Sequence, residues 1–295
     1  MSSIICKLSY RKLFSIFSFL VLSEILLSQT GNFVVEGHRG ARGLFAENTI
    51  EGFKQTLKLG VHVLEMDVVI SKDMKVVVSH DQWFKKNICE NVTGSKKKYY
   101  LYSMNYNEIR TFDCGSKHNK KFPQQKNFAA PKPLLSELLD SLEQFAKREN
   151  LPLPFYNIEI KSTKKGDGKI HPKVEVYTKL VYDEISNHHV ETRTNIQSFD
   201  VRPLEIMKQL NSNLSIALLS LNVSGAKKSL KKLSFKPNTY SPLYLFTHKQ
   251  TVSYCHENGV KIIPWTVNSP KKMLKMKSLG CNGIITDYPN IALKL

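Results

Sequence analysis

The fold is decided by residues 155–198, which read FYNIEIKSTKKGDGKIHPKVEVYTKLVYDEISNHHVETRTNIQS. Short apolar runs at 155–160 and 194–198 predict two strands, and apolar residues at helical spacing predict a helix over about 173–185 between them. A strand, a helix and a second strand in this order indicate parallel pairing, because two parallel strands need a crossover connection.

The same alternation runs through most of the chain. Further strands are predicted at 33–36, 61–70, 76–79, 215–219, 261–267 and 283–286. Further helices are predicted from 136 onward and at 203–210, 247–258 and 271–279. One more helix is predicted near the start of the chain, where Asn48 and Glu51 have the spacing of a capping box and Gly60 ends the helix. Eight or nine strands without a Gly-x-Gly-x-x-Gly turn after the first favour a TIM-type (β/α)8 barrel over a dinucleotide-binding sheet.

Two parts of the pattern do not fit a regular barrel. Residues 71–75 are too few for a crossover helix between the strands at 61–70 and 76–79. Residues 82 to about 133 lack sustained periodicity, and we interpret them as an insertion or cap after the third strand. A structureless loop of this length is uncommon in a compact domain, so we expect local structure there.

The first 29 residues have the layout of a secretory signal peptide. Three basic residues precede an apolar run at 13–22, and Glu24 follows that run. A membrane anchor is the alternative, but the run is far shorter than the ~20 apolar residues that a span needs. We therefore expect a signal peptide at 1–29, a single barrel domain at 30–295 and an exported protein, in the periplasm or the medium.

Four cysteines follow the leader, at positions 89, 114, 255 and 281. An even number in an exported protein permits disulfides. Cys89 and Cys114 are the pair expected to bond, because both fall in the segment without periodicity. Unpaired buried thiols are the alternative.

The chain is strongly basic, with 43 Lys and Arg against 25 Asp and Glu and a formal charge of +18, which stays near +16 without residues 1–29. Such a balance favours anionic partners, among them phosphates, anionic lipid surfaces and nucleic acid. No zinc-finger spacing or aromatic RNA-binding motif accompanies the lysines, so nucleic acid is not expected as a partner. Peripheral contact with an anionic membrane surface stays open, and no obligate protein partner is indicated.

Three carboxylates lie in strands that are otherwise apolar. Glu65 and Asp67 are two residues apart, so both face one side of their strand, and Glu159 and Lys161 repeat this arrangement in another strand. Buried charges without partners are costly, and oxygen ligands suit Mg²⁺ or Ca²⁺, so the three carboxylates predict a metal site. The alternatives are an amphipathic edge strand and an internal salt bridge from Lys161.

Two histidines directly follow predicted strands: His38 comes after the first, and His80 after the run at 76–79. In a barrel, residues at the carboxyl ends of the strands line the active site. A histidine pair there can divide proton transfer, one accepting and one donating, and Arg39 beside His38 offers a bidentate contact to phosphate. A structural role is the alternative for each histidine.

These motifs together resemble one family of enzymes, the glycerophosphodiester phosphodiesterases. The matching strings, in order, are GHRGARG at 37–43, ENT at 47–49, EMDV at 65–68, HD at 80–81, EIK at 159–161, QSF at 197–199, PWTVN at 264–268 and ITDYP at 285–289. They cover nearly the whole chain after the leader. Family members usually have proline in place of Ala46 and glycine in place of Met74, and the second departure suggests a different turn before Val76.

The resemblance implies a (β/α) barrel that cuts glycerophosphodiesters to sn-glycerol 3-phosphate and an alcohol with one divalent cation, Ca²⁺ or Mg²⁺. The roles that it implies are an acid/base pair of His38 and His80; phosphate contacts from Arg39 and Lys161; metal ligation by Glu65, Asp67 and Glu159; support from Glu47 and Asn48; and a glycerol pocket lined by Trp265.

Two other functions are compatible with the same barrel. A phospholipase-type enzyme acting on intact lipids would need an exposed apolar rim. Residues 82–130 instead carry ten Lys and Arg against three Asp and Glu, which favours a soluble, charged substrate. A non-catalytic surface binding protein would be indicated by loss of a ligand or a histidine, but all of these positions are filled.

Overall fold

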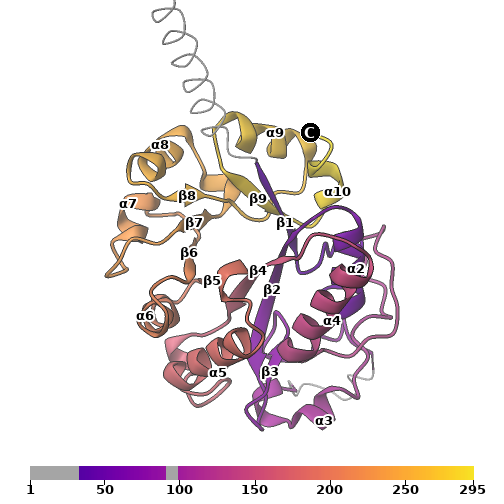
Figure 1. The fold of residues 1–295 in the computed structure, drawn as a ribbon. Helices are drawn as coiled ribbons and strands as arrows, with labels where there is room; N and C mark the ends of the chain where they lie inside the picture. Colours follow the sequence, from indigo (N-terminus) through magenta and orange to yellow (C-terminus); the bar gives the residue numbers. More distant parts are fainter. Residues whose placement is uncertain (1–32, 91–98) are drawn as a thin grey trace, which may run out of the picture. The chain divides into compact units, whose positions relative to one another are not determined.

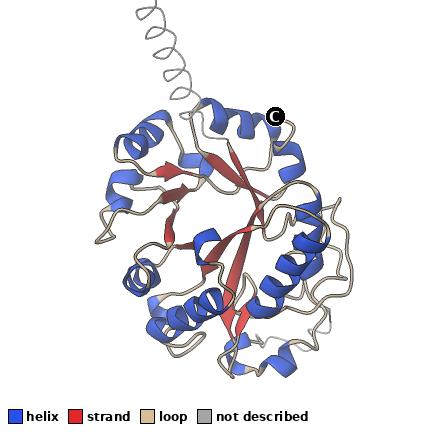
Figure 2. Cartoon of the chain, in the orientation of Figure 1, coloured by secondary structure: helices blue, strands red, loops and turns tan. Residues whose placement is uncertain are grey.

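Nine strands form a single sheet in the computed structural model, which describes residues 33–90 and 99–295. Eight of them are parallel neighbours in the order β8-β7-β6-β5-β4-β2-β1-β9, with helices on the outside (Figure 1, Figure 2). The strands are β1 (Val34–His38), β2 (Val63–Ile70), β3 (Val76–Val78), β4 (Phe155–Ile160), β5 (Thr194–Ser198), β6 (Ser215–Ser220), β7 (Thr239–Pro242), β8 (Lys261–Ile262) and β9 (Gly283–Thr286).

The helices lie between successive strands. They are α2 (Ile50–Lys58), α3 (Tyr106–Ile109), α4 (Leu135–Arg148), α5 (Val174–Asn187), α6 (Val201–Leu210), α7 (Gly225–Leu230), α8 (Lys249–Glu257), α9 (Pro270–Ser278) and α10 (Pro289–Ala292), with short 3-10 turns η1 (Leu101–Ser103), η2 (Lys164–Gly166), η3 (Glu191–Arg193) and η4 (Tyr244–Phe246). In the described part of the chain, no helix is both long enough and apolar enough to cross a membrane. The predicted signal peptide lies outside the described residues.

The parallel strands nearly close into a barrel. The amide of Asn282 donates to the carbonyl of Ile262 at 2.9 Å, and the amide of Ile285 donates to the carbonyl of Pro264 at 3.0 Å. These bonds join the segment of β8 to β9, which itself pairs with β1. The predicted TIM-type (β/α)8 barrel is therefore confirmed. The predicted strand at 261–267 is regular only at Lys261–Ile262, although the residues after it still contact β9.

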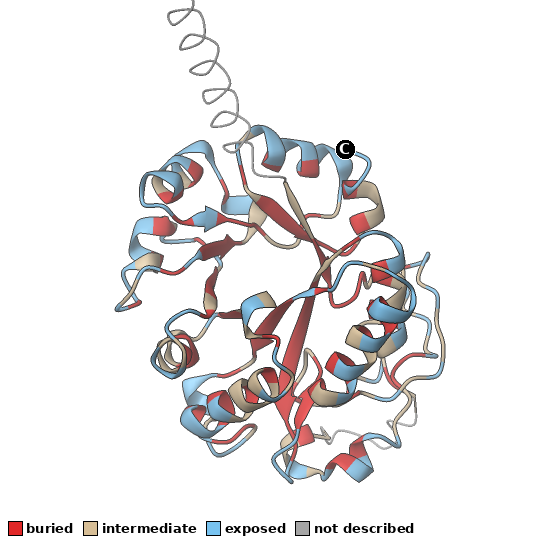
Figure 3. Cartoon of the chain, in the orientation of Figure 1, coloured by how far each residue is buried: buried red, intermediate tan, exposed pale blue. Residues whose placement is uncertain are grey.

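The strands have two chemically different faces. On β2, Leu64, Met66 and Val68 are fully buried, while Glu65 and Asp67 alternate with them and are also buried (Figure 3). A strand places alternate side chains on opposite faces, so the apolar set packs under the helices and the carboxylates point into the barrel. The polar residues of this barrel interior form the site described below.

β3 is not a barrel strand. It pairs antiparallel with the end of β2, Val68 opposite Val78 and Ile70 opposite Val76, so residues 71–75 form a turn and no crossover is needed. Met74 in this turn has φ 60°, the left-handed region that favours glycine. Met74 thus adopts a conformation that glycine adopts readily, and whether the turn differs from that of family members stays a prediction.

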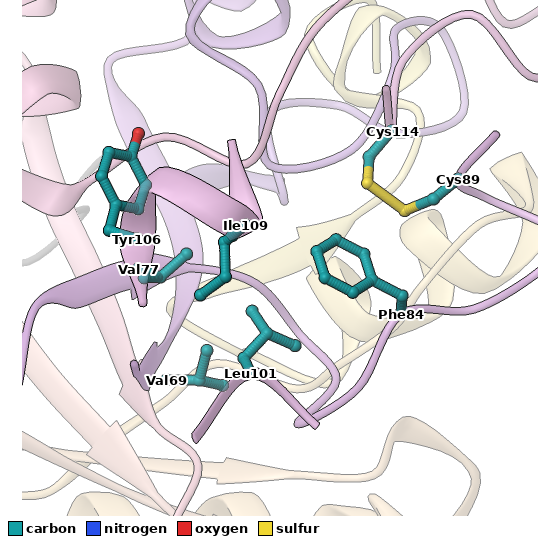
Figure 4. Packing of buried hydrophobic residues seen from close by; sticks show 8 residues of the cluster. All are labelled: Val69, Val77, Phe84, Cys89, Leu101, Tyr106, Ile109 and Cys114. Carbon is teal, nitrogen blue, oxygen red and sulfur yellow. A yellow bond between two sulfur atoms is a disulfide. The ribbon is translucent and has the colours of Figure 1, made fainter. Parts of the chain in front are cut away.

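The segment at 82–133, which we call the cap, has local structure where it is described. It contains η1 and α3, and Cys89 is bonded to Cys114, which confirms the predicted disulfide. Whether the cap is an insertion relative to the family stays a prediction. One buried cluster joins the cap to β2 and β3 (Figure 4): Val69, Val77, Phe84, Cys89, Leu101, Tyr106, Ile109 and Cys114.

The predicted capping box at Asn48 is wrong. Thr49 is the N-cap of α2: its backbone is extended, and its hydroxyl accepts the amide of Gly52 at 3.1 Å. Asn48 has φ 55°, and its side chain is directed elsewhere, because Nδ2 donates to Asp67 Oδ2 at 3.0 Å. The residue thus belongs to the site and not to the helix end.

Candidate active site

Three buried carboxylates converge at the carboxyl ends of β2 and β4. Glu65 and Asp67 come from β2 and Glu159 from β4, and the registers of the two strands place Asp67 opposite Glu159. One oxygen from each side chain lies within 4.8 Å of one from each of the others. The structure therefore brings together the three residues that the sequence predicts as metal ligands.

The carboxylates influence one another's ionisation. Burial, and then the charges of Asp67 and Glu159, raise the pKa of Glu65 well above its usual value. Burial also raises the pKa of Glu159 to about 7, although Lys161 opposes this. Burial opposes ionisation of Asp67 too, but Arg39 and other nearby cations hold its pKa well below the usual value.

Two basic side chains partly neutralise this cluster. Lys161 Nζ lies 2.7 Å from Glu159 Oε1 and 3.5 Å from Asp67 Oδ1, and Arg39 Nε lies 3.2 Å from Asp67 Oδ2. The internal salt bridge from Lys161, which was the alternative to a metal site, is thus present. It leaves Asp67 Oδ1 without a hydrogen bond. Among the described residues, no Lys or Arg side chain lies within ion-pair distance of Glu65, whose oxygens accept neutral donors, the amide of Arg39 and Nε2 of Gln197.

The donor set fits a hard divalent cation. All three groups are carboxylates, which Mg²⁺ and Ca²⁺ prefer, and Asp67 Oδ1 is buried without a hydrogen-bond partner. A cation there would favour the ionised forms of Glu65 and Glu159, whose pKa values burial raises. The geometry is therefore compatible with both a cation and the salt bridge to Lys161.

His38, at the end of β1, is held by an aspartate from β9. Its Nδ1 lies 2.5 Å from Asp287 Oδ1, and its Nε2 lies 3.9 Å from Glu65 Oε2. Asp287 also accepts Arg42 Nε at 2.7 Å and Asn268 Nδ2 at 2.6 Å. Since His38 and Arg42 hold the pKa of Asp287 well below its usual value despite burial, this carboxylate is ionised and His38 Nδ1 is the donor.

The protonation of His38 follows from this geometry. Burial lowers the pKa of His38 to about 4, although Asp287 opposes the shift. The imidazole is therefore neutral at neutral pH, with its proton on Nδ1 and the lone pair of Nε2 free to accept a proton. This arrangement suits a general base.

His80 follows β3 and lines the same cleft as His38. Its Nδ1 is 3.2 Å from Asp81 Oδ1, which Lys85 Nζ also contacts at 2.8 Å. Burial lowers the pKa of His80, while the charge of Asp67 opposes this. The structure thus places both predicted histidines beside the carboxylate cluster.

The residues predicted to support the site do contact it. Glu47 Oε1 accepts Arg39 Nη1 at 3.1 Å, and Asn48 donates to Asp67. The amide of Arg39 donates to Glu65 Oε2 at 3.0 Å. These bonds fix the orientation of Arg39 and of two carboxylates before any ligand arrives.

One cleft contains the predicted catalytic and ligand-binding side chains, apart from the fully buried Asp67. Its polar side is made by His38, His80, Arg39 and the residues around them, and its apolar side by Trp265 with Phe199, whose rings meet edge to face at 5.4 Å. The full lining is His38, Arg39, Arg42, Glu65, His80, Glu159, Lys161, Gln197, Phe199, Leu219, Trp265, Thr266 and Ile285.

Two functional residues were missed by the reasoning from sequence. Asp287 holds His38, and Gln197 Nε2 donates to Glu65 Oε1 at 2.9 Å. Both belong to strings that carried the family resemblance, but neither received a role. A signal was available for Asp287, because it directly follows a strand of the barrel, where active-site residues gather.

The fold and the cleft define the class of protein. A parallel (β/α) barrel with histidines, basic side chains and convergent carboxylates at the carboxyl ends of its strands has the architecture of a barrel enzyme, with a cleft suited to anionic substrates. Residues 38–291 match the model of the glycerophosphoryl diester phosphodiesterase family. The chain belongs to that family, and the predictions of family and of enzyme type are confirmed.

Individual relatives agree with this assignment. A glycerophosphodiester phosphodiesterase of Caldanaerobacter subterraneus is 30% identical over 262 residues, covering 89% of this chain and 97% of that protein. A lysophospholipase D of Homo sapiens is 25% identical, with 85% and 82% covered. A crystal structure of a family member from Silicibacter pomeroyi has a TM-score of 0.79 at 28% identity, covering 89% and 92%.

A second solved structure shows the same fold with a ligand. An Oleispira antarctica phosphodiesterase in complex with the product sn-glycerol 3-phosphate has a TM-score of 0.72, with 88% of this chain and 95% of that chain covered. Its identity to this chain is 21%, so the likeness supports the barrel and no more.

Proposed function

We propose that this chain hydrolyses glycerophosphodiesters to sn-glycerol 3-phosphate and an alcohol, in a reaction that depends on a divalent cation and on His38 and His80. Membership of the family supports the reaction class. The observation that carries the proposal is the His38–Asp287 pair beside the three carboxylates in one cleft, because it combines a prepared base with a place for a cation.

Glu65, Asp67 and Glu159 are the residues that would hold the cation. A bound divalent ion supplies charge neutralisation for the phosphoryl group and a lower pKa for the attacking hydroxyl. Gln197 and the amide of Arg39 orient Glu65, and Asn48 orients Asp67. Such supporting hydrogen bonds set the direction and basicity of ligand oxygens.

The histidines divide the proton transfer. Nε2 of His38 accepts the proton of the attacking hydroxyl as the new P–O bond forms, and Asp287 stabilises the imidazolium that results. His80 in its imidazolium form, which the charge of Asp67 favours, donates a proton to the oxygen of the alcohol as the old P–O bond breaks and becomes neutral. One proton is taken up and one is given, so the pair returns to its starting state after a proton exchange with solvent.

Substrate binding uses the rest of the cleft. Arg39 and Lys161 contact the non-bridging phosphate oxygens, which are anionic and accept hydrogen bonds from both. Trp265 and Phe199 form an apolar surface on which the carbon atoms of glycerol pack. Nε1 of Trp265 donates to the carbonyl of Ser241 at 2.9 Å, which fixes the plane of the indole.

We also propose that the protein is exported by the predicted signal peptide at 1–29. The Cys89–Cys114 disulfide supports this, because disulfides persist in oxidising compartments. Sequencing the amino terminus of the protein recovered from outside the cytoplasm tests the proposal. A terminus near residue 30 supports it, and recovery only from the cytoplasm with Met1 intact contradicts it.

The reaction is tested by release of glycerol 3-phosphate from glycerophosphocholine. Purified protein is assayed before and after EDTA, and again with Ca²⁺ or Mg²⁺ restored. We expect activity that EDTA removes and that one of the ions returns. Folded protein that releases no glycerol 3-phosphate from glycerophosphocholine or glycerophosphoethanolamine with either ion would refute the proposal.

A further inference from the structure

Exposed apolar side chains gather in the loops that follow β5, β6 and β7. Val223 is 77% exposed, more than any other large apolar side chain among the described residues. Large apolar side chains are seldom left in water in such numbers within three consecutive loops unless they bind something. The members of this group, which we call the rim, are Phe199, Leu221, Val223, Leu245 and Phe246.

The rim is continuous. Asn222, between Leu221 and Val223, donates through Nδ2 to the carbonyl of Phe246 at 2.6 Å, so the loops after β6 and β7 are in contact. The amide of Tyr244, in the second of these loops, donates to the carbonyl of Trp265 at 2.9 Å. Trp265 in turn meets the ring of Phe199. The rim therefore extends from the mouth of the cleft outward over two loops.

The rim lies on the face of the barrel that contains the active site. Its residues directly follow the carboxyl ends of the strands, as do the residues of the cleft. Only Phe199 also lines the cleft. The other four side chains do not line the cleft, so the reaction itself does not explain their exposure.

Positive charge flanks the rim, and the carboxylates of the adjacent loops are paired with Arg202. Residues 221–228, 243–250 and 263–272 contain no Asp or Glu. In the loops before them, Asp167 and Asp200 are both bound by Arg202, at 2.5 Å and 2.6 Å. Exposed lysines at the starts of the following helices and in η2 flank the apolar tips: Lys164, Lys165, Lys227, Lys228, Lys249, Lys271 and Lys272.

We propose that the rim docks onto the surface of an anionic lipid bilayer. Apolar loop tips can enter the interface between head groups and acyl chains, while lysines around them contact the anionic head groups. A second copy of the chain would fit worse, because it would bring two sets of lysines face to face. Docking presents the open cleft to the membrane surface, and it is independent of the reaction proposed above.

The first experiment places a reporter at the tip of the rim in the full chain, Val223→Trp. A matched chain has Leu210→Trp, at the end of α6 on the opposite face of the barrel. Both are mixed with vesicles of phosphatidylserine and phosphatidylcholine that contain brominated lipid. We expect the added emission of Val223→Trp to shift to shorter wavelength and to be quenched, and that of Leu210→Trp to remain unchanged. A reporter is needed because residues 1–32, common to both chains, contain an apolar run of their own.

The second experiment removes the apolar tips. Leu221, Val223, Leu245 and Phe246 are changed together to Ser, and the control chain has Leu59→Ser, Leu153→Ser and Leu210→Ser, exposed positions away from the rim. Each chain carries the same fluorescent label, placed away from the rim, and its partition coefficient to the anionic vesicles is measured at low salt. The partition coefficient of the rim variant should fall at least tenfold. The control should stay within about twofold of the wild type.

Three results would overturn the inference. The first is a Val223→Trp reporter that does not respond to anionic vesicles. The second is an equal response to vesicles of phosphatidylcholine alone, unaffected by salt, since head-group attraction should weaken as salt increases. The third is dimerisation in solution that the rim variant abolishes while vesicle binding persists. Turnover of glycerophosphocholine should be unchanged in the rim variant, so failure of the proposed reaction would be recognised separately.

Discussion

His38 depends on Asp287 for its direction and its tautomer. The two side chains are 249 positions apart in sequence and meet only because β9 pairs with β1. A carboxylate at Nδ1 keeps the proton there and leaves Nε2 as the acceptor that the reaction needs. An amide at the same place could present its NH₂ group to Nδ1 and stabilise the wrong tautomer.

We therefore predict that Asp287→Asn lowers kcat for glycerophosphocholine by about a hundredfold or more, with KM changed far less. Steady-state kinetics measure both constants, and circular dichroism checks that the variant is folded. Tyr288→Phe is the matched control at the neighbouring position and should keep nearly full activity. A kcat for Asp287→Asn within threefold of the wild type would show that His38 does not need this partner.

Glu36 is a second residue whose environment has a measurable consequence. It is buried in the barrel, and its recorded side-chain partner is the neutral Asn157, whose Nδ2 donates to Oε2 at 2.6 Å. Burial raises the pKa of Glu36 to about 7, although the bond from Asn157 opposes the shift. The folded chain therefore keeps this proton at pH values where the unfolded chain, with a pKa near 4.5, has lost it.

The raised pKa of Glu36 makes the folded state less stable as the pH rises. As pH rises from about 4.5 to about 7, the unfolded state releases its proton first, so the free energy of unfolding falls, by roughly 3 kcal/mol in total. Glu36→Gln cannot titrate, so the variant should be more stable than the wild type at pH 8 and nearly equal to it at pH 4.5. Thermal unfolding at the two pH values measures this, and an equal difference at both would contradict the prediction.

At the residue scale, the chemistry could be predicted wherever a side chain stood at the end of a strand or alternated within one. Glu65, Asp67 and Glu159 followed from alternation alone, and His38 and His80 from position. Gln197 and Asp287 could not be paired with their partners, because those contacts depend on which strands become neighbours across the barrel. Asn48 was assigned to a helix cap because its local pattern fits one, whereas its contact with Asp67 is long-range.

At the scale of the elements, the sequence pattern did not predict how every strand pairs. The run at 76–79 has a strand composition, but composition does not distinguish a barrel strand from the antiparallel β3. The short link at 71–75 was the available sign, since five residues permit a turn and not a crossover. β7 and α7 were not recognised, because both are short and lie in a stretch with little periodicity.

The turn between β2 and β3 gives a prediction about stability. Met74 has φ 60° and is 41% exposed, so its side chain contributes little burial to offset a backbone conformation that costs about 1–2 kcal/mol for a residue other than glycine. Met74→Gly should raise the free energy of unfolding by about 0.5–1 kcal/mol, after the extra freedom of glycine in the unfolded chain is counted.

Chemical denaturation measures this change. Met74→Ala is the matched control, because it removes the side chain and retains the Cβ that makes the conformation unfavourable. It should give no stabilisation. If both variants shift the free energy of unfolding equally, loss of the Met74 side chain causes the shift. The explanation by backbone strain is then wrong.

The cap depends on its disulfide. Cys89 and Cys114 are 25 residues apart in sequence, and both are buried in the cluster that joins the cap to β2 and β3. A cross-link over such a loop stabilises by about 3 kcal/mol. Changing both cysteines to Ala should lower the free energy of unfolding of the cap by about this amount. Limited proteolysis should then cut within residues 82–133 first.

Reduction provides the matched test of the cap. A reducing agent should lower the melting temperature of the wild type and leave that of the double Ala variant unchanged, since the other two cysteines of the described residues, Cys255 and Cys281, are buried and unpaired. Equal sensitivity of the two proteins to the reducing agent would show that the effect does not arise from Cys89–Cys114.

At the scale of the whole molecule, the barrel was predictable because its evidence is repeated. Each strand followed by a helix is weak evidence alone, but the repetition of this unit along most of the chain allows few other architectures. The position of the site followed from the same architecture, since all parallel strands end on one face. The apolar rim was not predictable from sequence, because Leu221, Val223 and Phe246 lie in short stretches whose exposure depends on how the loops pack against the barrel.

The carboxylate cluster joins two strands of the barrel, so a cation there should stabilise the whole fold. Glu65 and Asp67 belong to β2 and Glu159 to β4, and unfolding would separate them. A ligand that binds the folded state alone at a concentration of one hundred times its Kd raises the free energy of unfolding by about 2.7 kcal/mol. We predict that Ca²⁺ or Mg²⁺ raises the melting temperature of the wild type accordingly.

A variant with Glu65→Gln and Glu159→Gln separates this effect from general ion effects. It removes two ligands and the mutual repulsion that contributes to the raised pKa of Glu65, but also the charge that Lys161 contacts at 2.7 Å, so its melting temperature without added ions is its own reference. With ions its melting temperature should not rise. An equal rise in both proteins would place the stabilising ion elsewhere, and no rise in either would leave Lys161 and Arg39 as the only charges that balance the cluster.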